Sequence, residues 1–171
     1  MELVVPSPNY QHAFEQFYFD YVKNDPVNGE CYAECMSNFS AYVRSLLDEA
    51  QGINLKPTYV PCSHHWFINP QGQIVGVIRV RHNIDNTFLS QEGGHIGYDI
   101  APSQRGQGYG KAMLAAVLPE LKSLDISRAL ITADEDNIAS RRVIEANGGQ
   151  LDNVIFGATF QCQLARYWVS I

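Results

Sequence analysis

One segment of the sequence has the composition of a phosphate-binding loop. It runs from Gln104 to Lys111 as QRGQGYGK, between a predicted strand and a predicted helix. In that setting, backbone N–H groups and the positive end of the helix dipole bind a phosphate. Glycines let the backbone approach the phosphate oxygens, because they carry no Cβ atom that would clash. The alternative is a glycine-rich turn that only starts a helix.

Three phosphate-binding patterns compete for this segment. The Walker A pattern G-x-x-x-x-G-K-[ST] fails, because Arg105 and Ala112 stand where it requires a glycine and a hydroxyl residue. The dinucleotide pattern G-x-G-x-x-G fails, because Lys111 stands at its last glycine. The pattern [QR]-x-x-G-x-[GA] is met by Arg105, Gly108 and Gly110. The segment is therefore predicted to hold a pyrophosphate.

The cysteines and histidines form no recognisable metal motif. The first cysteine pair has the spacing C-x₃-C, which is neither a redox motif nor a zinc-knuckle spacing. His64 and His65 lie near a cysteine, but adjacent residues of a strand point to opposite faces. We therefore predict no metal, and four free thiols as in a reducing cytoplasm: Cys31, Cys35, Cys62 and Cys162.

The elements that position the loop follow from hydrophobic periodicity and turn residues. Asn69-Pro70-Gln71-Gly72 fits a type I turn and predicts a hairpin, and Pro119 is expected to kink the helix after the loop. Asn137 is a helix N-cap. The predicted strands are 3–5, 64–68, 73–82, 95–100, 129–133, 150–156 and 160–170, and the predicted helices are 14–22, 36–50, the segment after the loop, and 137 to 147–149.

Composition narrows the class of protein. The 171 residues hold 12 Lys+Arg and 18 Asp+Glu, a net charge of −6, which argues against binding to nucleic acid or to an anionic membrane. No stretch approaches the ~18 apolar residues that span a bilayer, and the N-terminus does not resemble a signal peptide. The order β-α-α-β-β-β-α-β-α-β-β predicts a single domain, 1–171, of the mixed α/β class.

Charge and aromatic residues are concentrated near the N-terminus. Residues 1–50 contain eight acidic and two basic residues, and nine of the 19 aromatic residues of the chain. A ligand-binding interpretation is that this segment attracts cations by charge and by cation–π contact. The alternative is that the acids lie on solvated helix faces and the aromatics fill the core.

Two segments resemble the GCN5-related N-acetyltransferase (GNAT) superfamily. The first is IGYDIAPSQRGQGYG at 96–110, and the second is NIASRRVIEANG at 137–148. The second is similar to the N-x-x-S-x-R-V-x-E-x-x-G variant of ribosomal-protein N-acetyltransferases, and GGHIGY at 93–98 resembles a branch of acetyltransferases with no assigned substrate. The element order also matches the family fold, in which the strand ending at Ile100 splays from the strand at 129–133.

The resemblance implies acetyl-CoA as co-substrate and no metal. Backbone amides of the glycine loop would hold the pyrophosphate, the pantetheine arm would lie between the splayed strands, and an amine acceptor would enter beside the first two helices. The cofactor-binding residues implied are Ile100, Arg105, Gly106, Gln107, Gly108, Tyr109, Gly110, Lys111, Asn137 and Ser140.

Acetyl transfer to an amine needs a proton acceptor, a polarised thioester carbonyl and a stabilised thiolate. The resemblance places His95 where many relatives carry a glutamate, with Glu92 as the second candidate base. A backbone N–H near 96–98 would hold the oxyanion. The usual acid, a tyrosine, is replaced by Ile144. Tyr98 is a candidate substitute and Tyr109 and Tyr167 are other tyrosines, each of which could equally be a packing residue; the alternative is that the thiolate leaves unaided.

The expected function is therefore a cytoplasmic N-acetyltransferase. The acetyl group would pass to a primary amine, either a small cationic amine or a peptide or protein amine, by direct attack in a ternary complex. The alternative is an acetyl-CoA-binding sensor or interaction module with weakened catalysis. The expected partners are the amine acceptor and neither nucleic acid nor membrane, and a homodimer is left open.

Overall fold

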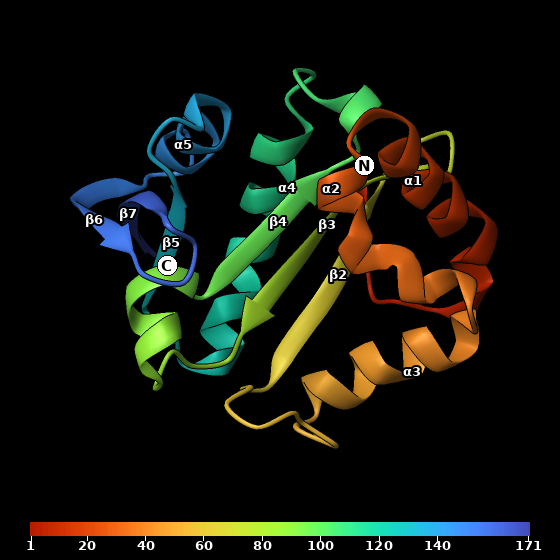
Figure 1. The fold of residues 1–171 in the computed structure, drawn as a ribbon, viewed down its shortest axis with the longest axis horizontal. Helices are drawn as coiled ribbons and strands as arrows, with labels where there is room; N and C mark the ends of the chain where they lie inside the picture. Colours follow the sequence, from red (N-terminus) through yellow and green to blue (C-terminus); the bar gives the residue numbers. More distant parts are fainter.

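Two antiparallel sheets organise the computed structural model, which describes residues 1–171 (Figure 1). The first sheet has the order β1-β2-β3-β4, and the second has the order β5-β7-β6. The strands are β1 (Glu2–Val4), β2 (Cys62–Ile68), β3 (Ile74–Arg81), β4 (Ile96–Ile100), β5 (Arg128–Asp134), β6 (Gln150–Gly157) and β7 (Cys162–Ser170). This arrangement agrees with the predicted mixed α/β class.

The strands β4 and β5 diverge from a single point of contact. The N–H of His95 donates to the carbonyl of Leu130 at 2.7 Å, and the N–H of Leu130 donates back to Nδ1 of His95 at 3.0 Å. Beyond this point the two strands are not paired, and each is the edge of its own sheet. The predicted splay is confirmed.

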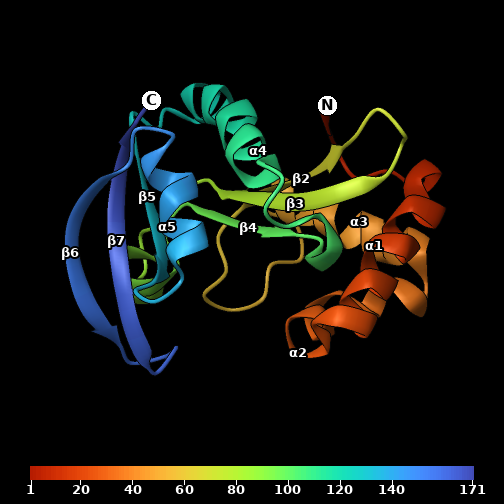
Figure 2. The same ribbon diagram turned by 90° about the horizontal axis from the view of Figure 1, so that it is seen from above.

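Helices cover both faces of the first sheet. Figure 2 shows α4 on one side of β2, β3 and β4, and α1 and α3 on the other. The helices are α1 (Gln11–Asn24), α2 (Pro26–Gly29), α3 (Phe39–Ala50), α4 (Tyr109–Val117) and α5 (Ile138–Glu145). No helix has the length and apolar character needed to cross a membrane.

The core divides into two clusters of buried side chains. One cluster lies under α4 and includes residues from both sheets, such as Ile96 of β4 and Ile131 of β5. The other is aromatic and packs α1 and α3 on the first sheet, with Phe14 and Trp66 at a ring-centroid distance of 4.7 Å. Core packing therefore accounts for much of the aromatic content of residues 1–50.

Several elements differ from the predicted ones. Residues Glu30–Met36 form a 3₁₀ helix, so α3 begins later, after the N-cap Asn38, and Met36 is exposed. Leu89–Gly93 form a turn of π-helix that sequence periodicity did not reveal. As predicted from Pro119, the helix after the loop changes at Val117 into a 3₁₀ segment, Leu118–Leu124.

Candidate active site

The glycine loop is a run of unpaired backbone donors. None of the N–H groups of residues 106–111 donates to another protein group, because they lie before and within the first turn of α4. Gly106 and Gly108 have φ values of +77° and +83°, and a Cβ atom at either position would meet nothing within 4 Å. These glycines therefore set a left-handed backbone beside open space, where an anion can approach.

Gly110 has a different role in the loop. A Cβ atom at this position would lie 3.1 Å from Cγ2 of Val143, so the missing side chain permits close packing of α4 on α5. Asn137 caps α5, as predicted, with its Oδ1 accepting from the N–H of Ser140 at 3.0 Å. The two helix N-termini are thereby fixed next to each other on one cleft.

That cleft follows the path from the loop to the splayed strands. Its outer part has a volume of about 760 Å³ and is lined by the loop glycines, Ile100, Tyr109 and Lys111. An inner part of about 240 Å³ lies between β4 and β5. The residues common to both parts are Tyr98, Asp134, Asn137 and Ser140. Together they form a continuous channel with the size and shape for an elongated ligand.

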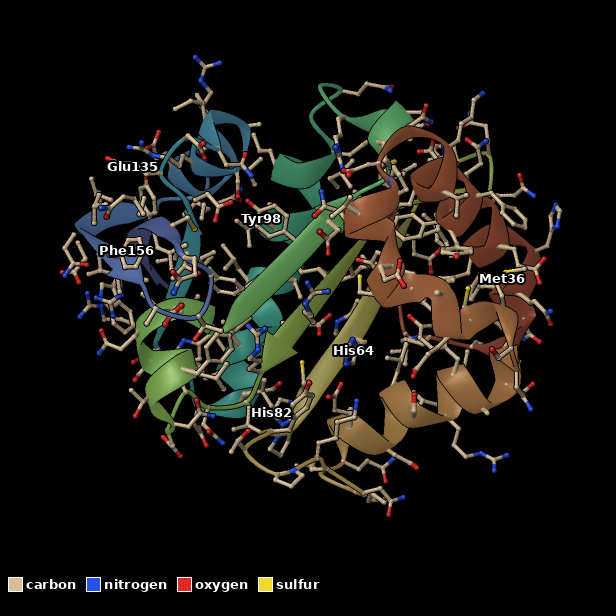
Figure 3. The ribbon with its side chains drawn as sticks, viewed as in Figure 1. Met36, His64, His82, Tyr98, Glu135 and Phe156 are labelled. Carbon is tan, nitrogen blue, oxygen red and sulfur yellow. The ribbon has the colours of Figure 1, made fainter.

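Two hydroxyl groups meet where the two parts join. Tyr98 projects from β4 toward α5 (Figure 3), and its hydroxyl lies 2.7 Å from Oγ of Ser140 and donates to the Ser140 carbonyl at 3.1 Å. Burial raises the pKa of Tyr98 to about 12, so its hydroxyl is protonated at neutral pH. Ile144, one helical turn further along α5, is completely buried and presents nothing to the cleft.

The Arg105 side chain lines the outer cleft and is held there by protein partners. Its guanidinium donates to Asp25 at 2.7 Å and its Nε donates to the Ile100 carbonyl at 3.2 Å. Asp20 accepts from the N–H of Ser103 at 2.9 Å, on the same side of the loop. The N-terminal helices therefore hold the loop, and the side chain of Arg105 is a structural anchor. The exposed side chain of Gln107 likewise contacts its own loop, through the Ser103 carbonyl at 3.4 Å.

Glu92 borders the inner cleft but is tied to the β6–β7 turn. Its carboxylate accepts from the N–H of Thr159 at 3.0 Å, from the hydroxyl of Thr159 at 3.2 Å and from the N–H of Phe160 at 3.2 Å. Three donors leave lone pairs free on a carboxylate. Glu92 is thus a buried acid that fixes one wall of the cleft and faces its interior.

His95 lies where β4 and β5 begin to diverge, and it does not line either part of the cleft. Burial lowers the pKa of His95, so its imidazole is neutral at pH 7. A neutral imidazole has one acceptor nitrogen, and Nδ1 already accepts from the Leu130 N–H. To take a proton, His95 would have to give up this bond.

A second cleft of about 500 Å³ lies on the α3 side of the first sheet. Arg79 of β3 lines both this α3-side cleft and the inner cleft. Its guanidinium lies against Gly97 and pairs with Asp99 at 3.2 Å, and Asp99 also accepts from the Tyr32 hydroxyl at 2.7 Å. A group that enters through the α3-side cleft therefore meets the inner cleft beside Arg79.

Sequence reasoning did not single out three residues of this site. Arg79 lies on β3 and Asp134 at the end of β5, two strands that are mostly buried apolar runs, and no motif identified either residue. Arg141 and Arg142 are adjacent in the sequence, and the sequence alone allows each to be either a solvated helix charge or a phosphate contact. The structure separates them: Arg142 lines the outer cleft, whereas Arg141 donates to the Tyr167 hydroxyl at 2.8 Å.

A helix N-terminus with free amides, opening onto a cleft between diverging strands, is an arrangement that can bind a phosphate-bearing ligand. A family model described as "Acetyltransferase (GNAT) domain" matches residues 18–150. The chain therefore belongs to this acetyltransferase family, as its motifs predicted. No curated protein sequence gives a significant match.

Solved structures with the same fold cover nearly the whole chain at low identity. RimL, a ribosomal L7/L12 α-N-protein acetyltransferase in complex with coenzyme A, is 19% identical, with a TM-score of 0.69 over 99% of this chain and 93% of that one. RimJ of Mycobacterium smegmatis, with a CoA-disulfide, is 16% identical, with a TM-score of 0.70 over 98% and 80%. MccE, a Microcin C7 self-immunity acetyltransferase with acetyl-CoA and AMP, is 16% identical, with a TM-score of 0.67 over 99% and 91%.

Proposed function

We propose that this protein transfers an acetyl group from acetyl-CoA to a primary amine by direct attack in a ternary complex. The observation that carries the proposal is the run of unpaired N–H groups at 106–111, at the mouth of a channel that continues between β4 and β5. A pyrophosphate at the loop would let the pantetheine arm extend along this channel. The thioester would then lie in the inner cleft.

The acceptor amine would enter through the α3-side cleft, which we therefore call the acceptor-side cleft, and would reach the thioester beside Arg79, where this cleft meets the inner cleft. An alkylammonium must lose its proton before it attacks. We propose that Glu92 accepts this proton through a water molecule, because Glu92 borders the inner cleft and keeps free lone pairs. His95, whose acceptor nitrogen is occupied, would hold the strands apart and position the channel.

The departing thiolate would be stabilised by the Tyr98 hydroxyl. Tyr98 and Ser140 are the hydroxyl pair at the junction of the two cleft parts, and the tyrosine is protonated at neutral pH. A thiolate is a good leaving group, so a hydrogen bond suffices and full proton transfer is not required. Most of the acceleration would come from holding amine and thioester together.

The second candidate function is an acetyl-CoA-binding module without turnover. The observation that favours it is the buried Ile144, which leaves α5 without a proton donor of its own at that position. The two functions are separated by incubating the protein with acetyl-CoA and a panel of amines while measuring free CoA thiol. If the protein is an acetyltransferase, the rate at which free CoA thiol appears should rise with the concentration of one of the amines. Binding of acetyl-CoA without thiol release from any amine class would support the module instead.

A further inference from the structure

A cluster of metal-ligating side chains lies outside the acetyl-CoA channel. Glu49 in the last turn of α3 and Cys62 and His64 on β2 bring a carboxylate oxygen, a sulfur and an imidazole nitrogen within 4.8 Å of one another. All three residues are largely shielded from solvent: Cys62 is 5% exposed, and the side chains of His64 and Glu49 are 17% and 23% exposed. Exposed acids gather by chance on many surfaces, whereas this cluster is enclosed.

The fold explains why these three residues meet. Residues two apart on a strand share a face, so Cys62 and His64 both point toward α3, while His65 points to the other face and contacts Glu120 at 2.9 Å. Figure 3 shows His64 in the space between β2 and α3. The sequence argument that separated His64 from His65 was correct, but it had no means of placing Glu49, which comes from a different element.

We propose that Glu49, Cys62 and His64 bind a divalent transition-metal ion, with Zn²⁺ as the best match. Thiolate, imidazole and carboxylate are the ligands of protein zinc sites, whereas Mg²⁺ and Ca²⁺ require oxygen ligands. Three protein ligands leave a fourth position, as in zinc sites that bind water or an outside ligand. Glu49 and His64 both line the acceptor-side cleft, so that position opens toward it.

Metal binding would replace protons at the site. Nε2 of His64 and a carboxylate oxygen of Glu49 are in direct contact, and a metal ion would take the place of the hydrogen between them. Cys62 would release its thiol proton, so that one thiolate and one carboxylate neutralise the two charges of the ion. The ion would join the end of α3 to β2 and fix one wall of the acceptor-side cleft.

The site is tested by titrating the chelator-treated, full-length protein with Co²⁺, whose bond to a thiolate gives a charge-transfer absorption band. We expect one equivalent of Co²⁺ to produce the band, and Zn²⁺ to abolish it by displacement and to raise Tm. Mg²⁺ should do neither. Absence of the band in the wild-type protein would overturn the proposal and leave Glu49 and His64 as a hydrogen-bonded pair.

Variants locate the site. Cys62→Ser should lose the charge-transfer band. Glu49→Gln is a near-isosteric change that removes a ligand charge. It should weaken Co²⁺ binding by more than the roughly 10–100-fold that follows when a residue that only hydrogen-bonds to a metal ligand is replaced. Cys162→Ser and His82→Gln are the matched controls, and both should keep the band. A band that survives Cys62→Ser, or an affinity that does not change in Glu49→Gln, contradicts the assignment. None of these readouts depends on acetyl-CoA or on turnover.

Discussion

Replacing Gly108 by valine tests whether the loop binds the pyrophosphate of acetyl-CoA. Gly108 has φ +83° and no atom within 4 Å of the position of a Cβ. In an unliganded protein the new side chain therefore meets no steric obstacle. Its two effects are a strained backbone and a bulky group in the space where the phosphate must approach.

The two effects have different expected sizes. A left-handed conformation costs an L-residue roughly 1–2 kcal/mol, which lowers Tm by about 2–8 °C in a chain of this length. Losing two charge-assisted hydrogen bonds from the loop to the pyrophosphate, at about 1.5–3 kcal/mol each, weakens acetyl-CoA binding by roughly 10²–10⁴-fold. The affinity should collapse while the protein stays folded.

Gly72→Val is the matched control. Gly72 has φ +78°, also has no atom within 4 Å of an added Cβ, and lies in the β2–β3 turn, away from the acetyl-CoA channel. Both variants should lose similar amounts of Tm in thermal unfolding, but only Gly108→Val should lose acetyl-CoA affinity by calorimetry. If Gly108→Val binds acetyl-CoA like the wild-type protein, the loop does not bind the pyrophosphate.

Four further predictions address the site. Glu92→Gln should lower kcat by about 10²–10⁴-fold with acetyl-CoA affinity retained; an unchanged kcat would exclude Glu92 as the base. His95→Ala should lower Tm and acetyl-CoA affinity but leave the acidic limb of the pH–rate profile unchanged, since its acceptor nitrogen is occupied; loss of the limb would restore His95 as the base. Asp25→Asn should raise the calorimetric Kd of acetyl-CoA by less than about fivefold, because the ion pair with Arg105 is partly exposed; a larger change would mean that the anchor does more than hold the loop. Diamines should be acetylated with a higher kcat/KM than neutral-tailed amines of equal length, and salt should reduce the difference; equal values at low salt would leave the acids of residues 1–50 a purely structural role.

The local features of the fold were readable from the sequence. Glycine spacing predicted the loop, and Asn137 predicted the cap of α5. Pro119 predicted the irregular continuation of α4 as a 3₁₀ segment. Each of these depends on the backbone preferences of one or a few neighbouring residues. The turn between β2 and β3 likewise depends on local chemistry, because Asn69-Pro70-Gln71-Gly72 fits a type I turn.

Contacts between distant segments were not readable. Asp25 and Arg105 are 80 residues apart, and nothing in the composition around either one indicates the other. The Arg105 match to the loop pattern identified a segment that lines the outer cleft, but it could not show that the Arg105 side chain pairs with Asp25, between α1 and α2. The choice between His95 and Glu92 depends in the same way on which partners the fold brings to each side chain.

The divergence of β4 and β5 leaves two free sheet edges inside one molecule. A free edge normally invites pairing with another chain, which is a route to aggregation. Here the two edges diverge from the His95–Leu130 contact and are not paired with each other. An occupant of the gap would close both edges at once, and the ligand-free protein is therefore the state most exposed to edge-to-edge association.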